Sequence, residues 1–455
     1  MGMTFRVTAL TTLMITGLTA VTAAVAPAPA VSALTAPAAG TKLWTARFQG
    51  PGGFGQPAAT AASPNGAAVF VTGFIQPPSG RPRYATVGYN ALTGAKLWSS
   101  VFHQGPKGNT SEADDVAVSP DGSKVFVTGF TLDGLTTVAY DAATGGKLWV
   151  KNVAGATGTG VAVSPDGATL FVSGSGLQGT GPDWVMFAYS TASGALLWKR
   201  HYSGAQGLGA QASPDGSEVF LRAITGSSAV TIAYNARTGK KLWAQVFSGL
   251  GWANSESFAV SPDGSTVFVL GTSTPSLSSV PLSYATVAYD AKTGAQRWVR
   301  YDTGLSSTQF GRTFARSIAV KPDGTTVFVT GENTEANGTG GYSTIAYDTA
   351  TGTKLWQQRY FASGRGGEAA EAWFAGVSPD GSEVFVTGLT HRSHLATFGY
   401  DSTSGAVLWS TVYRRTACAV AEGAVNPVTP ELMVTGSCFS KAIRSQDYLT
   451  VAYSG

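Results

Sequence analysis

The fold is decided by a stretch that runs Asp115-Val-Ala-Val-Ser-Pro-Asp-Gly-Ser-Lys-Val-Phe-Val-Thr-Gly129 and then, after a short loop, Thr136-Thr-Val-Ala-Tyr-Asp-Ala-Ala-Thr-Gly-Gly-Lys-Leu-Trp149. Its runs of Val, Thr, Tyr and Phe predict four short β-strands, A to D, at 116–119, 124–128, 136–140 and 147–153. Between them lie Ser-Pro-Asp-Gly and Asp-Ala-x-Thr-Gly, in which Pro fixes φ, Asp bonds to nearby backbone and Gly accepts a positive φ. We therefore expect a four-stranded antiparallel sheet whose turn aspartates are structural.

This unit recurs along the chain, and the tryptophan of strand D marks each copy at intervals of 45 to 58 residues. These tryptophans are Trp98, Trp149, Trp198, Trp243, Trp298, Trp356 and Trp409. An eighth unit has strands A to C, expected at 417–420, 431–435 and 448–453, but no strand D. A matching strand D, Thr41 to Phe48 with Trp44, precedes the first unit.

The orphan strand at each end predicts a closed ring. We expect an all-β fold over residues 41–455, an eight-bladed β-propeller of four-stranded antiparallel blades, with the last blade closed by the N-terminal strand. The alternative, a linear solenoid with capped ends, leaves both orphan strands unexplained.

The first forty residues differ in character, because Arg6 is their only charge and 7–25 is an apolar run of mostly small residues. This pattern predicts a secretory signal peptide over 1–33, with cleavage after Ala30 or Ala33, and an Ala/Pro-rich linker over 34–40. We therefore expect a secreted, extracellular and, from the composition, bacterial protein without a membrane span after cleavage. An uncleaved N-terminal anchor is the alternative.

Charge and cysteine content narrow the class of partner. The formal net charge is only +4 and no basic run interleaved with aromatics occurs, which argues against nucleic acid. The two cysteines, Cys418 and Cys438, lie on neighbouring expected strands, so in an oxidising compartment they predict a disulfide.

The repeat resembles known families at two segments. Ala-Tyr-Asp-Ala-x-Thr-Gly-x-x-Leu-Trp resembles the repeat of pyrroloquinoline-quinone-like propellers, and Val-Ser-Pro-Asp-Gly-x-x-Val-Phe-Val-Thr-Gly resembles YVTN-type propeller repeats. The first resemblance implies that the seven tryptophans of strand D and Trp44 dock between blades. For a quinone-dependent member, the resemblance implies two adjacent cysteines against the cofactor, a tryptophan that forms the floor of the cofactor site, and a Glu/Asn/Asp set that holds Ca²⁺. Adjacent cysteines are missing here, so the resemblance implies the fold and not a quinone cofactor.

A site is expected where the repeats disagree. The B–C and D–A connections carry the irregular insertions, and the first residues of strand A stand at the channel mouth on that face. Aligned on Val-Ser-Pro, these mouth positions include Asp114, Asp115, Glu256, Arg316 and Trp373, with Thr416 and Ala417 in the last unit. Glu371 and Trp252 lie in the adjoining loops. The ligand-binding candidates are therefore Asp114, Asp115, Glu256, Arg316, Glu371, Trp373 and Trp252. A solvated rim whose charges bond to each other is the alternative.

These observations favour a monomeric binding or scaffold module for an extracellular or cell-envelope protein, peptide or glycan. No catalytic residue, protein-bound metal or cofactor is expected, although the acidic groups leave Ca²⁺ open. The alternative is a hydrolase or lyase that uses Asp114, Asp115, Glu256 and Glu371 at the channel mouth. A third and less favoured hypothesis is a quinone-dependent dehydrogenase.

Overall fold

The computed structural model describes residues 37–455 apart from 51–52, 79, 103–109, 177–182, 227, 248–253, 274–282, 304–312, 335–339, 362–369, 391, 415–416 and 442–443. For 254–256, 273, 303, 334 and 420–421 only the backbone is described. The chain from Ala38 to Gly455 forms one compact unit. The leader predicted for 1–33 lies outside the described residues.

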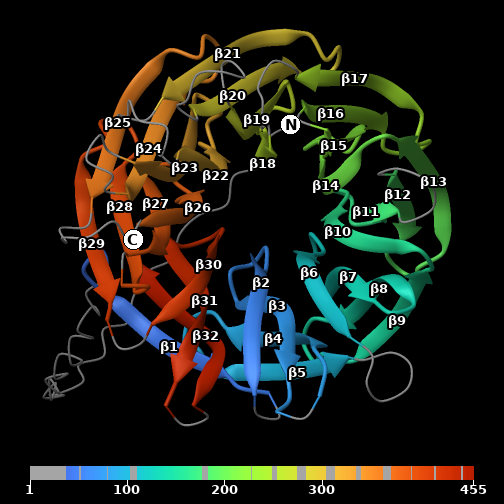
Figure 1. Ribbon diagram of the computed structural model, residues 1–455, viewed down its shortest axis with the longest axis horizontal. Helices are drawn as coiled ribbons and strands as arrows, with labels where there is room; N and C mark the ends of the chain where they lie inside the picture. The colour runs from blue at the N-terminus through green and yellow to red at the C-terminus, as the bar shows by residue number, and fades with distance from the viewer. Residues whose placement is uncertain are drawn as a thin grey trace, which may run out of the picture. The chain divides into compact units, whose positions relative to one another are not determined.

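The described strands form eight four-stranded antiparallel sheets that stand as blades around a central axis (Figure 1). Each blade runs outward from strand A to strand D. The innermost strands A are β2 (Phe54–Ala62), β6 (Ser111–Val118), β10 (Ala156–Val163), β14 (Gln206–Ala212), β18 (Asn254–Val260), β22 (Thr313–Val320), β26 (Glu371–Val377) and β30 (Cys418–Val425). The strands B are β3 (Ala68–Gln76), β7 (Lys124–Thr131), β11 (Thr169–Gly176), β15 (Glu218–Thr225), β19 (Thr266–Ser273), β23 (Thr326–Thr334), β27 (Glu383–Leu389) and β31 (Glu431–Ser440).

The outer half of each blade consists of strands C and D. The strands C are β4 (Arg83–Asn90), β8 (Gly134–Asp141), β12 (Asp183–Ser190), β16 (Ser228–Asn235), β20 (Ser283–Asp290), β24 (Gly340–Asp348), β28 (Leu395–Asp401) and β32 (Ser445–Ser454). The strands D are β5 (Lys96–Phe102), β9 (Lys147–Val153), β13 (Leu196–Ser203), β17 (Lys241–Phe247), β21 (Gln296–Thr303), β25 (Lys354–Phe361), β29 (Val407–Tyr413) and β1 (Lys42–Phe48). We number the blades 1 to 8 by their strand A.

Blade 8 is completed by the N-terminal strand, as the sequence predicts. β1 pairs antiparallel with β32 from Lys42 opposite Tyr453 to Phe48 opposite Tyr448, and Figure 1 shows the blue strand beside the red one. The partly exposed Arg47 forms an ion pair with the buried Asp447 across this seam. The eight-bladed propeller closed by the N-terminal strand is thereby confirmed.

The strand-D tryptophans lie between neighbouring blades and are hydrogen-bonded there. In seven of them the indole N–H donates to a carbonyl oxygen just after strand C of the next blade, at 2.6 to 3.0 Å. Trp44 of blade 8, for example, donates to Ala91 of blade 1 at 2.6 Å. The eighth, Trp409, lies beside the Glu383 carboxyl, whose pKa burial raises to about 7.

The turn aspartates hold backbone and hydroxyl groups. Asp121 accepts from the Ser119 hydroxyl at 2.5 Å and from the Ser123 backbone N–H at 3.0 Å. These bonds lower the pKa of Asp121 to about 2, because they stabilise its charged form. In the C–D turn, Asp141 accepts from the backbone and hydroxyl of Thr144, both at 2.8 Å. The most regular motifs of the sequence therefore specify turns.

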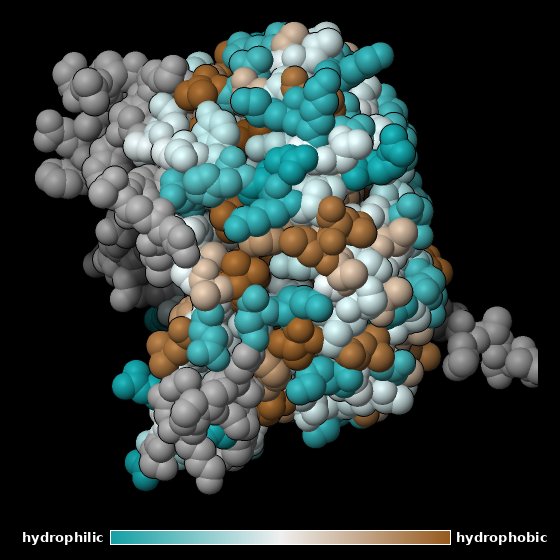
Figure 2. Space-filling model, turned by 90° about the vertical axis from the view of Figure 1, so that its right-hand side faces the viewer, coloured by the Kyte–Doolittle hydropathy of each residue, from teal (hydrophilic) through white to brown (hydrophobic). Residues whose placement is uncertain are grey.

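The outer wall of the ring shows separate hydrophobic patches among polar side chains (Figure 2). The leucine before the tryptophan sits at a β-bulge in each strand D that has it, as Leu148 does between the paired residues Lys147 and Trp149. Six such leucines are 42% to 54% exposed: Leu97, Leu148, Leu197, Leu242, Leu355 and Leu408. The bulge turns the leucine outward while the tryptophan packs inward.

Strand A of blade 8 departs from the prediction. It covers Cys418–Val425 and not 417–420, and its A–B turn begins at Asn426. Asn426 takes the place of the usual serine, because its backbone N–H bonds to Glu431 across the same five-residue span as Ser119 to Lys124. The predicted disulfide between Cys418 and Cys438 is present and joins β30 to β31. No helix in the described part of the chain is long and apolar enough to cross a membrane.

Candidate ligand site on the propeller axis

Each innermost strand contains one β-bulge, at nearly the same place in every blade. A bulge inserts one unpaired residue and re-aims its side chain, and bulges are frequent next to functional sites. In blade order the bulged residues are Ala58, Asp114, Thr159, Leu208, Glu256, Arg316, Trp373 and Val420. The six whose side chains are described all line one cavity on the axis.

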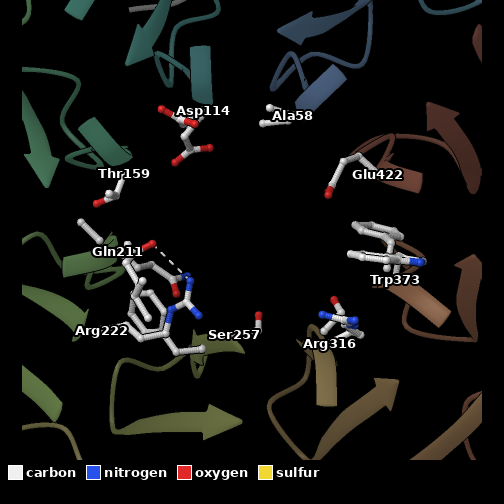
Figure 3. Close-up of a pocket in the computed structure, with 17 residues that line it drawn as sticks. Ala58, Asp114, Thr159, Gln211, Arg222, Ser257, Arg316, Trp373 and Glu422 are labelled. Atoms are coloured by element: carbon white, nitrogen blue, oxygen red, sulfur yellow. Dashed lines mark hydrogen bonds between the residues drawn. The ribbon is translucent and has the colours of Figure 1, made fainter. Parts of the chain in front are cut away.

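This cavity has a volume of about 540 Å³ and takes part of its wall from each of the eight blades (Figure 3). Its size falls within the range of roughly 300–1,000 Å³ that is usual for small-molecule sites. Besides the six bulged residues, the wall consists of Ala59, Asp115, Gly209, Ala210, Gln211, Arg222, Ser257, Phe258, Ser317, Phe374 and Glu422. The cavity is therefore polar and charged, with an aromatic sector on blade 7.

The charges in the wall are divided by sign. Asp114 and Asp115 belong to blade 2 and Glu422 to blade 8, whereas Arg222 belongs to blade 4 and Arg316 to blade 6. In a ring of eight, blade 2 stands opposite blade 6 and blade 8 opposite blade 4. Figure 3 shows this arrangement, with Asp114 across from Arg316 and Glu422 across from Arg222. As far as the side chains are described, the cavity thus has an acidic half and a basic half.

Asp115 combines a place in the wall with a structural role. Its carboxylate accepts from the backbone N–H of Val116 and from that of Val161 in the next blade, both at 2.8 Å. Burial raises the pKa of Asp115 to about 6, and these two bonds and Arg222 oppose the rise. Asp115 therefore ties blade 2 to blade 3 as well as supplying negative charge.

Asp114 and Glu422 present carboxyl groups that titrate close to neutral pH. Burial, followed by the charges of Glu112 and Asp115, raises the pKa of Asp114 to about 7. Burial and the charge of Asp115 raise the pKa of Glu422 to about 8. A nearby positive charge would stabilise the ionised form of these carboxyl groups and so lower their pKa values again.

On the other side, Arg316 stacks on Trp373. The guanidinium carbon lies 4.3 Å from the centre of the indole, and a terminal nitrogen lies 4.0 Å from a carboxylate oxygen of Glu371. Arg222 donates from Nη2 to the carbonyl oxygen of Leu208 at 3.2 Å. Stacking fixes a guanidinium plane and leaves its in-plane N–H groups for a ligand anion.

The structure brings together four of the candidates from the sequence: Asp114, Asp115, Arg316 and Trp373 line the cavity. Glu371 lies beside Arg316 but not in the wall. The backbone of Glu256 occupies the bulge of blade 5, and its side chain is outside the described part, as is all of Trp252.

The mouth positions predicted for the last unit, Thr416 and Ala417, were wrong. Glu422 faces Thr435 of strand B just as Asp115 faces Thr128, so Glu422 is the equivalent of Asp115. The alignment of blade 8 with the other repeats failed because Asn426-Pro427 replaces Ser-Pro there. Alignment of Val425-Asn426-Pro427 on Val-Ser-Pro would have given the correct register.

Sequence reasoning also missed Arg222. It occupies the position of the threonine in Val-Phe-Val-Thr-Gly, which reads Val-Phe-Leu-Arg-Ala in blade 4. The site was expected on the first residues of strand A, whereas strand B also reaches the cavity at this level. A buried threonine changed to arginine was a visible signal. Trp184, in contrast, is completely buried and packs on Tyr234.

A family model described as "Outer membrane protein assembly factor BamB" (PQQ_2) matches residues 133–411, more than half of the chain. The chain belongs to the PQQ_2 family. The expected pyrroloquinoline-quinone-like repeat is thereby confirmed. No curated protein matches the sequence.

Solved propellers resemble this PQQ_2 protein in fold. The C-terminal WD40 domain of Sif2 has a TM-score of 0.61 at 11% identity, covering 92% of this chain and 99% of that one. The Dos1 propeller has a TM-score of 0.60 at 12% identity, with 91% and 94% covered. The quinohemoprotein alcohol dehydrogenase ADHIIG from Pseudomonas putida HK5 has a TM-score of 0.55 at 13% identity, with 91% and 76% covered. At these identities the likeness shows the fold alone.

The residues of this PQQ_2 protein do not fit the quinone cofactor of the dehydrogenases it resembles. Its two cysteines are not adjacent, and they are bonded to each other inside blade 8. Trp373, an aromatic residue of the cavity wall, is covered on one face by Arg316. Within the described residues, no group of three or more His, Cys, Asp or Glu side chains is placed to hold a metal ion.

Proposed function

We propose that this PQQ_2 protein is an exported binding or scaffold module that takes a polar ligand into the cavity on its axis. The observation that carries the proposal is the ring of bulges. Packing of the blades does not require charged or aromatic residues at these positions, since blades 1, 3 and 4 have Ala58, Thr159 and Leu208 there. Blades 2, 6 and 7 nevertheless direct Asp114, Arg316 and Trp373 into the cavity.

Two further observations support the binding role and the location. The family model is named for an assembly factor, which agrees with a protein that acts by holding a partner. The disulfide and the leader-like residues 1–33 agree with an oxidising compartment outside the cytoplasm. The partners we propose are a peptide, glycan or protein of the cell envelope, bound by a monomer.

The test uses the protein without residues 1–33 and a variant with a filled cavity. Ala58 lines the cavity and its side chain is partly exposed, so Ala58→Trp places an indole in the space without disturbing the blade interfaces. Thermal shift and calorimetry would be measured with short peptides, oligosaccharides and Ca²⁺. We expect at least one of these classes to stabilise the unaltered protein and not Ala58→Trp. Equal stabilisation of both proteins would show that the cavity is not the site.

A second candidate, a hydrolase or lyase, is favoured by the acidic half of the cavity. Asp114 and Asp115 are neighbours with pKa values of about 7 and 6, and carboxyls with separate values near neutral pH suit general acid–base chemistry. Product formation from a bound peptide or glycan, lost in Asp114→Asn with binding retained, would establish it. Intact ligand recovered after prolonged incubation would exclude it for that ligand.

A further inference from the structure

We propose that the axial cavity selects a linear zwitterion, with the ligand's ammonium group in the acidic half and its carboxylate in the basic half. This inference rests on the proposed function, because it names the class of ligand that the same cavity takes. A short peptide with free amino and carboxyl ends has this chemistry.

The acidic half is formed to receive a cation. Asp114 is exposed to the cavity. Among the described residues of the wall, none donates a hydrogen bond to its carboxyl group. Asp115 follows it in the chain and Glu422 lies two blades away in the same half, and the charge of Asp115 acts against those of both. Among the described side chains, Glu112 on β6 also acts on Asp114, and Arg222 on β15 acts on Asp115. An ammonium group would relieve the repulsion and supply up to three donors.

The basic half is formed to receive an anion. Arg316 is held by the Trp373 face at 4.3 Å, and the carboxylate that pairs with it among the described residues, Glu371, is at 4.0 Å, longer than a good hydrogen bond. The plane of the guanidinium is thus fixed, but its N–H groups are not all hydrogen-bonded within the described part of the chain. A carboxylate can accept two parallel N–H groups from such a plane. Arg222 adds a second positive charge to the same half.

The separation of the two halves favours one ligand with both charges over two separate ions. Acidic and basic groups stand on opposite blades, and the space between them is the cavity of about 540 Å³. This volume corresponds to roughly 18 water molecules at about 30 Å³ each, which is more than a single small ion fills. A linear molecule that spans the cavity satisfies both halves at once, and the Trp373–Phe374 sector offers it apolar contact.

The test crosses ligand caps with wall substitutions. Calorimetry would compare tri-alanine with N-acetyl-tri-alanine and with tri-alanine amide, on the unaltered protein, Asp114→Asn and Arg316→Gln. We expect each cap to weaken binding by about tenfold or more, because each removes one charge-assisted contact. Arg316→Gln should weaken the binding of tri-alanine by a similar factor and leave the binding of tri-alanine amide unchanged. Asp114→Asn should weaken the binding of tri-alanine by a similar factor and leave the binding of N-acetyl-tri-alanine unchanged. Arg297→Gln is the matched control, because Arg297 pairs with Asp290 on the outer surface.

Two additional readouts sharpen the result. At pH 7 the binding of an ammonium group should release protons, seen as a dependence of the heat on the ionisation enthalpy of the buffer, since the carboxyls are partly protonated without ligand. 6-Aminohexanoic acid carries the same charges without peptide groups. If it binds, charge placement alone selects the ligand; if only tri-alanine binds among the two, the ligand is a peptide.

The outcomes separate this inference from the proposed function. Capped peptides that bind as tightly as tri-alanine, or substitutions that weaken all three peptides equally, would overturn the zwitterion. If tri-alanine fails while a neutral oligosaccharide binds and Ala58→Trp abolishes that binding, the zwitterion is overturned and the proposed function stands. If no ligand binds in a way that Ala58→Trp affects, both are overturned.

Discussion

Gly40 lies directly against the indole of Trp409, in the backbone conformation of a C–D turn. Its φ is +74°, and a Cβ atom added there would lie 2.7 Å from Cε3 of the indole. Gly94 has the same relationship to Trp44, with φ of +69° and 2.5 Å. The backbone N–H of Gly40 bonds to Ser454 at 2.7 Å, as that of Gly94 bonds to Asn90. The turn of blade 8 is thus assembled from two distant segments.

This relationship predicts that Gly40→Val destabilises the ring at its closure. The left-handed φ alone costs a residue with a Cβ about 1–2 kcal/mol, and the contact with Trp409 adds to it. Thermal unfolding of the variant should begin at a lower temperature. Gly80→Val is the control, because the nearest described atoms to a Cβ there belong to Pro77, at an ordinary contact distance of 3.5 Å. Equal melting of both variants would contradict the role of Gly40.

Removal of the closing strand should have a larger effect. Deletion of residues 41–48 leaves β32 without its outer partner and removes Trp44 from the junction with blade 1. We expect a strong loss of stability, measured by circular dichroism and melting. A synthetic peptide of residues 38–48 should restore the transition when added in excess, and a scrambled peptide should not. Unchanged melting of the deletion would refute the closure.

The neighbours Asp114 and Asp115 should respond differently to substitution. Asp115→Ala leaves the backbone N–H of Val161 without its acceptor, and an unsatisfied buried donor costs about 1–3 kcal/mol. Asp114→Ala removes a carboxyl that is unfavourably charged, so the free energy of unfolding should stay the same or rise. Chemical denaturation at pH 7.5 measures both. A loss at Asp114 as large as at Asp115 would be inconsistent with this assignment.

The acidic half of the cavity also predicts how stability depends on pH. Folding raises the pKa of Glu422 to about 8 and that of Asp114 to about 7, so the folded state binds more protons than the unfolded chain between about pH 4 and 8. Stability must then fall as pH rises through this window. The turn aspartates have lowered pKa values and lose their contribution only below about pH 4.

We therefore expect the ligand-free protein to melt about 1–2 °C higher at pH 5 than at pH 8, which is what about 1–2 kcal/mol gives in a domain of this size. The double variant Asp114→Asn, Glu422→Gln should reduce this difference. Glu383 also has a raised pKa and lies at the junction of blades 7 and 8 rather than in the cavity, so Glu383→Gln serves as a comparison. If the double variant keeps the full difference, the cavity carboxyls are not its source.

The ring of blades could be predicted from the sequence because each repeat contains the signals of its strands and turns. Turn residues, strand alternation and the tryptophan of strand D recur with little change, so errors in one copy are corrected by the others. The seam was also predictable, since Thr41 to Phe48 copies strand D. The disulfide followed from the neighbouring positions of Cys418 and Cys438 on expected strands.

The site was predictable only in part, for a related reason. Asp114 and Arg316 were found because they depart from a repeat whose register was certain. Glu422 was missed because blade 8 lacks Ser-Pro, and Arg222 because the site was expected on strand A and the adjoining loops, whereas Arg222 lies on strand B. The opposition of acidic and basic blades depends on the closure of the ring, which places residues about two hundred positions apart across one cavity, and no local pattern contains it.

The ring of bulges has a consequence for how such a protein changes over time. Duplication of a blade copies its packing, turns and tryptophan together, while the bulged residue remains a single codon that the core does not constrain. Ala58, Thr159 and Leu208 are therefore sites where a new ligand preference can be acquired one blade at a time. A library randomised at these three positions should retain folded members at high frequency, which makes the axis a practical starting point for engineered receptors.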